Sequence, residues 1–82
     1  MRWYEDLNGD RVNLSLVQCI RITNQFYDYR FRGFVVVEAS TGDELYPLWA
    51  EKCESEPSTH EYDKTLNRAK LFVDTLVREL NK

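Results

Sequence analysis

Residues 58–80 read STHEYDKTLNRAKLFVDTLVREL, and this stretch predicts the helix that decides the fold. Ser58 and Glu61 fit a capping box, in which each side chain accepts a hydrogen bond from the other residue's backbone amide. Apolar residues then recur every three or four positions, which places them on one face of a helix. That face comprises Tyr62, Leu66, Ala69, Val73, Leu76 and Leu80, widened by Phe72 and Val77, with Leu71 opposite. We therefore expect an amphipathic helix over about residues 59–80.

The residues before this helix are typical of antiparallel strands. Within residues 16–26, Ile20 and Ile22 alternate with Arg21 and Thr23, the mark of a half-buried strand, and Leu16-Val17 breaks the phase, so we expect a bend or bulge there. Residues 29–39 contain the run Val35-Val36-Val37, apolar on both faces, which indicates a central strand. Residues 44–50 return after a turn at 40–43 as a further strand. Because Pro47 has no amide to donate, this strand lies at an edge or carries a bulge at Pro47.

A tight hairpin is predicted near the N-terminus. Asn8-Gly9 suits the positive φ angles of a two-residue turn. Folding about this turn gives the pairs Asp6–Arg11, Tyr4–Asn13 and Trp3–Leu14. Trp3, Val12 and Leu14 would then share a face, where we expect the first part of the core.

Together these elements predict one α+β domain over residues 1–82. We expect an antiparallel sheet of four to six strands, strongly coiled or partly barrel-like, with one C-terminal amphipathic helix packed on it. The strands fall within residues 2–50, a loop covers 51–58 and the helix covers about 59–80. In element order alone this layout resembles a reduced pleckstrin-homology-type fold, a likeness that implies nothing about lipid or peptide binding.

Composition indicates a folded, soluble, cytoplasmic protein. Apolar residues make up 43% and charged residues 30% of the 82, far from the signature of disorder. No stretch reads as a signal peptide or a membrane span. In a reducing cytosol Cys19 and Cys53 would both be thiols. A domain of this size buries only about 60% of its unfolded surface, so self-association is expected to help it.

Several motifs fail on inspection, so no metal or cofactor is expected. Asp6, Asn8 and Asp10 alternate as in a calcium-binding loop, but glycine and glutamate are missing from the later positions that the loop requires. Residues 32–39 match only half of the aromatic strand motif of RNA-recognition domains. Cys53 and His60 have no third group at a spacing that announces a catalytic triad.

Three classes of function stay open. We expect a protein-interaction module or homodimer without catalytic activity, because 11 of 82 residues are aromatic, more than one small core covers readily. The first alternative is a protein that binds single-stranded nucleic acid through aromatic and basic residues, although the net charge of −3 opposes it. Those residues are Arg21, Tyr27, Tyr29, Arg30, Arg32 and Phe34. The second alternative is a small enzyme that uses acidic residues or Cys53 and His60.

The predicted interaction face lies on one side of the sheet. A turn at Gly42-Asp43 gives the pairs Val37–Leu48, Ala39–Tyr46 and Val36–Trp49. We expect the helix to cover the Val35, Val37 and Leu48 side, because small aliphatic residues allow close approach. The other side is left for a protein partner or a second copy and bears Arg30, Arg32, Phe34, Val36 and Trp49. If the sheet curls strongly, both faces are buried instead.

Overall fold

The structure is a computed structural model that describes residues 3–24, 33–53 and 59–80. In chain order its elements are β1 (Trp3–Glu5), β2 (Arg11–Asn13), the 3₁₀ helix η1 (Leu14–Leu16), β3 (Cys19–Thr23), β4 (Phe34–Ser40), β5 (Leu45–Lys52) and α1 (His60–Leu80). The α+β class and the C-terminal helix are confirmed. The expectation of one sheet is wrong, because the five strands form two antiparallel sheets, β1-β2 and β3-β4-β5. Neither sheet closes into a barrel within the described residues.

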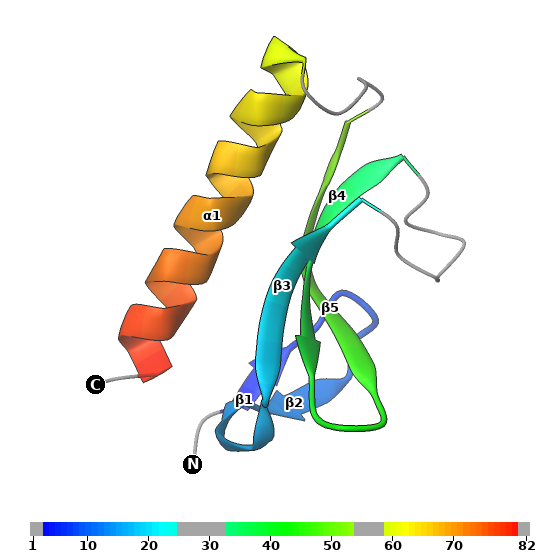
Figure 1. The fold of residues 1–82 in the computed structure, drawn as a ribbon. Helices are drawn as coiled ribbons and strands as arrows, with labels where there is room; N and C mark the ends of the chain where they lie inside the picture. The colour runs from blue at the N-terminus through cyan, green and yellow to red at the C-terminus, as the bar shows by residue number, and fades with distance from the viewer. Residues whose placement is uncertain (1–2, 25–32, 54–58, 81–82) are drawn as a thin grey trace.

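The helix α1 lies along one face of the three-stranded sheet (Figure 1). The β1-β2 hairpin lies at the end of the molecule where α1 finishes, so the first and last described elements are neighbours there. The central strand is β4, as its apolar run predicted, and residues 35–39 are all buried. The helix therefore has two different neighbours along its length, the sheet and the hairpin.

The pairing of β4 with β5 contains a bulge that reverses part of the predicted facing. Ala39 pairs with Tyr46 as expected, but beyond Pro47 the register shifts by one residue. Val37 pairs with Trp49 and Val36 with Ala50, so the predicted pairs Val37–Leu48 and Val36–Trp49 are wrong. The shift lies beside Pro47, which has no amide for the ladder and is commonly tolerated at bulges. As a result Leu48 and Trp49, although adjacent, both face the helix.

The hairpin register is also one residue away from the predicted one. Trp3 pairs with Asn13 and Tyr4 with Val12. The reason is a longer turn: the Asp6 carboxylate accepts hydrogen bonds from the amides of Asn8 (3.0 Å) and Asp10 (2.8 Å). Because side chains alternate along a strand, Tyr4 then faces the core with Val12, and Trp3 is 54% exposed instead of buried.

The helix begins one residue later than its capping motif suggested. The Thr59 hydroxyl accepts a hydrogen bond from the amide of Tyr62 (3.2 Å), which caps the first turn. Ser58, half of the predicted capping box, lies outside the described residues. Leu71 is exposed as predicted, at 62%, whereas Val77 is exposed rather than part of the apolar face.

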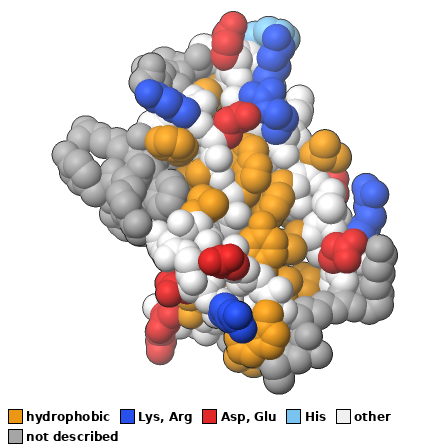
Figure 2. Space-filling model, turned by 180° about the vertical axis from the view of Figure 1, so that it is seen from behind, with side chains coloured by type: hydrophobic (Ala, Val, Ile, Leu, Met, Phe, Trp, Pro, Cys, Tyr) orange, Lys and Arg blue, Asp and Glu red, His pale blue; other side chains and the backbone are white. Residues whose placement is uncertain are grey.

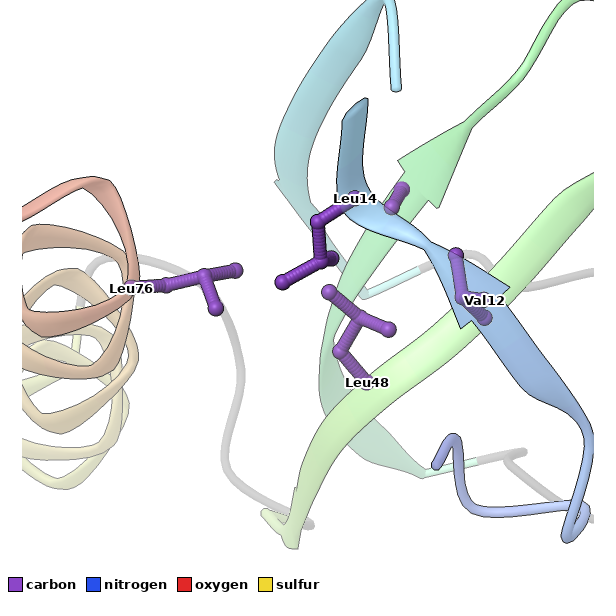
Figure 3. Packing of buried hydrophobic residues seen from close by; sticks show 5 residues of the cluster. Val12, Leu14, Leu48 and Leu76 are labelled. Atoms are coloured by element: carbon purple, nitrogen blue, oxygen red, sulfur yellow. The ribbon is translucent and has the colours of Figure 1, made fainter. Parts of the chain in front are cut away.

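The core consists of two clusters that share α1. In the first cluster Ala69 packs against Val35 and Val37 of β4. In the second cluster Leu76 reaches from α1 toward Leu14 and Leu48 (Figure 3). The predicted side of the sheet for the helix is therefore confirmed. Each fully buried valine or leucine contributes about 1.5–3 kcal/mol relative to an exposed one, so these clusters hold the helix in place.

Candidate interaction groove

A groove with a volume of about 520 Å³ opens between the β1-β2 hairpin and the C-terminal half of α1. It is lined by Trp3, Tyr4, Leu14, Phe72, Thr75, Leu76 and Glu79. It exists because the hairpin packs on the second core cluster without pairing with β3, β4 or β5. The size falls within the range of about 300–1,000 Å³ that is typical of binding clefts.

Two adjacent aromatic residues of β1 build one wall of the groove. Tyr4 is half-buried and meets Phe72 edge-on, with ring centroids 6.2 Å apart and an interplanar angle of 73°. Burial raises the pKa of the Tyr4 phenol above its ordinary value of 10.0, so this side chain is neutral across the physiological range. Trp3, the neighbouring residue on β1, also lines the groove and keeps more than half of its surface exposed. The wall therefore combines a fixed ring and an accessible one.

Phe72 forms the opposite wall and is itself held by a second aromatic contact. The Trp49 ring stacks on Phe72 with centroids 6.3 Å apart and an interplanar angle of 25°. This contact depends on the β5 bulge, which turns Trp49 toward the helix. Phe72 thus lies between Tyr4 and Trp49, and such aromatic pairs contribute about 0.5–1.5 kcal/mol each beyond the area they bury. The groove wall is preorganised by the fold.

The polar side chains that α1 contributes to the groove are Thr75 and Glu79. The Thr75 hydroxyl donates to the backbone carbonyl of Leu71 (2.9 Å), within the helix. Among the described residues that line the groove, Glu79 is the one that carries a charge. Most of the described residues that line the groove are aromatic or aliphatic, so this arrangement is suited to binding apolar groups.

The face of the three-stranded sheet away from α1 carries a different constellation. Arg21 of β3 forms a hydrogen-bonded ion pair with Glu38 of β4, whose carboxylate is only 2% exposed. A shallow hollow of about 160 Å³ lies over this pair and is also lined by Cys19, Ser40 and Leu45. Because a buried carboxylate needs a partner, the pair has a structural explanation.

The structure separates the residues of the predicted interaction face. Phe34 and Val36 lie on the side away from α1, but Trp49 lies on the helix side because of the bulge. Val36 is fully buried, so it offers no surface to a partner. Arg30 and Arg32, like the Tyr27 and Tyr29 suggested for nucleic-acid stacking, lie outside the described residues. A binding role for the half-buried Phe34 stays a prediction.

The residues considered for chemistry are spread over different parts of the fold. Cys19 is an exposed thiol on the face away from α1, whereas Cys53 is half-buried against the cluster under the helix. His60 is exposed at the first turn of α1. Among residues 3–24, 33–53 and 59–80, no group of three or more histidine, cysteine, aspartate or glutamate side chains is placed to hold a metal ion.

Comparison with models of known protein families, with curated proteins and with solved structures finds no match for this chain. Over the described part of the chain, no helix combines the length and the apolar character needed to cross a membrane. The candidate site therefore rests on its geometry alone.

One feature of the sequence indicated an exposed aromatic ring at this groove, but the hairpin register that we predicted assigned the wrong residue to the surface. Trp3 and Tyr4 are adjacent on a strand, so only one of them can face the core. Whichever residue faces outward leaves a large ring at the surface beside the hairpin. What the sequence did not contain was the position of the hairpin against α1.

Proposed function

We propose that this protein works by binding another protein, without catalysing a reaction, and that the groove between β1 and α1 receives the bound group. The observation that carries this proposal is an apolar groove of about 520 Å³ with a half-exposed tryptophan on its wall. Tryptophan and tyrosine are enriched among the residues that dominate interface energetics. A cytosolic location, in which Cys19 and Cys53 stay reduced, belongs to the same proposal.

Surface apolarity adds support. On the side seen in Figure 2, hydrophobic side chains gather in a continuous band with charged side chains along its margins. An apolar centre with a charged rim is the usual composition of a protein interface. The rigid wall formed by Phe72, Tyr4 and Trp49 supports binding as well, because preorganised groups lose little entropy when a partner docks.

A photo-crosslinking experiment tests the proposal in the cells that make the protein. In the full chain, the photoreactive residue p-benzoylphenylalanine replaces Trp3. The matched control carries the same residue in place of Leu7, which is 47% exposed in the turn of the same hairpin and does not line the groove. We expect a discrete protein adduct from position 3 at a yield at least about tenfold above position 7. Adding Thr75→Arg, which places a long charged side chain in the groove, should remove that adduct.

Equal adduct yields at positions 3 and 7 would mean that the groove is not the binding site. The lack of any adduct at position 3 would refute the proposed protein binding. Unchanged thermal unfolding of the Thr75→Arg variant is required before its loss of adduct counts, since Thr75 is exposed and its replacement should leave the fold intact.

A further inference from the structure

We infer that Asp6 determines which aromatic ring of β1 is accessible at the groove, because it holds the β1-β2 hairpin in one of two registers that the sequence allows. In the observed register Tyr4 faces the core and Trp3 is accessible. In the other, which we call the slipped register, β1 is displaced by one residue against β2 and the two rings exchange sides. Asp6 is therefore a positioning residue, and its effect on a partner rests on the proposed function.

The turn of the hairpin is held by the carboxylate of Asp6. Its Oδ1 atom accepts hydrogen bonds from the amides of Asn8 (3.0 Å) and Asp10 (2.8 Å). The Asp6 carbonyl accepts a further bond from the amide of Gly9 (3.1 Å), whose φ angle is 84°. This is the pattern of a type I turn followed by a glycine in the left-handed region, and aspartate is favoured at the first position of such a turn. It closes a loop of three residues, 7–9.

The sequence of this loop also suits a shorter turn. Asn8-Gly9 favours a two-residue turn in which both residues have positive φ angles. That turn sets Asp6 opposite Arg11, a favourable cross-strand pair of opposite charges. Trp3 then lies opposite Leu14, which defines the slipped register. The hairpin therefore has two turn types available that differ by one residue in register.

The strand β1 fits both registers because its pattern repeats at the next residue. Residues 3–6 read Trp-Tyr-Glu-Asp, so either phase places an aromatic ring and, two positions later, a carboxylate on the core side. In the observed register these residues are Tyr4 and Asp6, and in the slipped register they are Trp3 and Glu5. The alternation of apolar and polar residues, which normally fixes the register of a strand, therefore does not discriminate between the two.

The burial of Asp6 indicates how much depends on its turn. The side chain is 5% exposed, and its Oδ2 atom is buried without a hydrogen-bond partner among the described residues. An unsatisfied carboxylate oxygen is costly, but either register brings one carboxylate to the core side, so this cost does not choose between them. The two hydrogen bonds to Oδ1 do. A residue at position 6 that keeps the charge but cannot accept those bonds should slip, since the two-residue turn and the pair with Arg11 then favour the other register.

Acrylamide quenching of Trp3 fluorescence tests the inference, in the full chain with Trp49→Phe so that one indole remains. Asp6→Glu keeps the charge but moves the carboxylate one methylene away from the turn amides, which only short side chains reach. We expect the quenching of Trp3 to fall at least about twofold, because the indole moves from 54% exposed to the core side. The matched control Asp6→Asn keeps an acceptor at the same position and should leave the quenching unchanged.

Nuclear Overhauser contacts across the hairpin identify the register directly. The wild type and Asp6→Asn should show Tyr4 opposite Val12, whereas Asp6→Glu should show Trp3 opposite Leu14. Unchanged or increased quenching in Asp6→Glu overturns the inference, because a retained register leaves the indole in place and an undocked hairpin exposes it further. Equal protection of Trp3 in Asp6→Glu and Asp6→Asn overturns it as well, since the turn acceptor would then have no effect.

The effect on binding has a separate readout. With p-benzoylphenylalanine at position 3, Asp6→Glu should lose the protein adduct and Asp6→Asn should keep it. If the wild type gives no adduct but the quenching changes as expected, the proposed binding function falls and the role of Asp6 in the hairpin stands. If the wild type gives the adduct and the quenching of Asp6→Glu is unchanged, the binding function stands and the role of Asp6 falls.

Discussion

The two halves of α1 have the same apolar stripe but different surroundings. At what we call the closed end, Ala69 lies directly against Val35 and Val37, and all three residues are 0–1% exposed. At the open end, about one and two turns after Ala69, Phe72 and Leu76 border a groove of about 520 Å³. The closed end meets a hydrogen-bonded sheet, and the open end meets a two-stranded hairpin that is paired with no other described strand.

A regular apolar face on a helix does not determine how tightly the rest of the fold packs against that face. Alanine at the closed end brings the helix backbone close to β4, so little space is left there. At the open end the larger side chains of Phe72 and Tyr4 hold the helix and hairpin apart while touching edge-on. We therefore expect substitutions at the contact points to alter stability and substitutions on the rim to alter binding.

The largest effect is expected at Leu76, the buried residue of α1 at the open end. Its side chain is 6% exposed and joins Leu14 and Leu48 in the second core cluster. Leu76→Ala should cost about 2–5 kcal/mol of unfolding free energy, because it removes packed methyl groups and enlarges a space that already exists. Urea denaturation followed by circular dichroism measures this. A loss below about 1 kcal/mol would show that the open end is too loosely packed to hold the helix.

A smaller loss is expected from overpacking the closed end. Ala69 is fully buried against β4, so Ala69→Leu should force the helix away from the sheet and cost about 1–3 kcal/mol. The matched control is Lys70→Leu, at the next and exposed position, which should stay within about 0.5 kcal/mol. If Ala69→Leu leaves the unfolding free energy unchanged, α1 does not pack more tightly at the closed end than at the open end.

Alkaline pH should weaken the open end through Tyr4. Since burial raises the pKa of this phenol above 10.0 in the folded protein, the folded state favours the neutral form. The stabilisation is therefore complete below about pH 10 and is lost as the pH rises through the folded-state pKa. Thermal unfolding from about pH 8 to 11 should show a steeper loss for the wild type than for Tyr4→Phe. Parallel curves for the two proteins would contradict the burial of this ring.

The smallest effect on stability is expected at Leu71, on the exposed side of α1. With 62% of its surface exposed, Leu71→Ala should change the unfolding free energy by no more than about 0.5 kcal/mol. A loss comparable to that of Leu76→Ala would mean that the helix is rotated relative to the sheet.

Several features followed from local pattern alone. The spacing of apolar residues identified the helix, the buried Ala69 and Leu76, and the exposed Leu71. The continuous run at 35–37 identified the central strand, and Pro47 identified a position where the β5 ladder would be irregular. These succeed because helix period and missing amides are properties of a few consecutive residues.

What only the tertiary structure decided was strand register and the placement of the hairpin. A shift of one residue reverses the side to which each later side chain points, so the bulge in β5 moved Trp49 to the helix side and the longer hairpin turn moved Trp3 to the surface. Local sequence cannot fix such a step, because alternating patterns before and after the bulge look the same in either phase. The groove follows from both steps together with the packing of β1 against α1, which joins residues far apart in the chain.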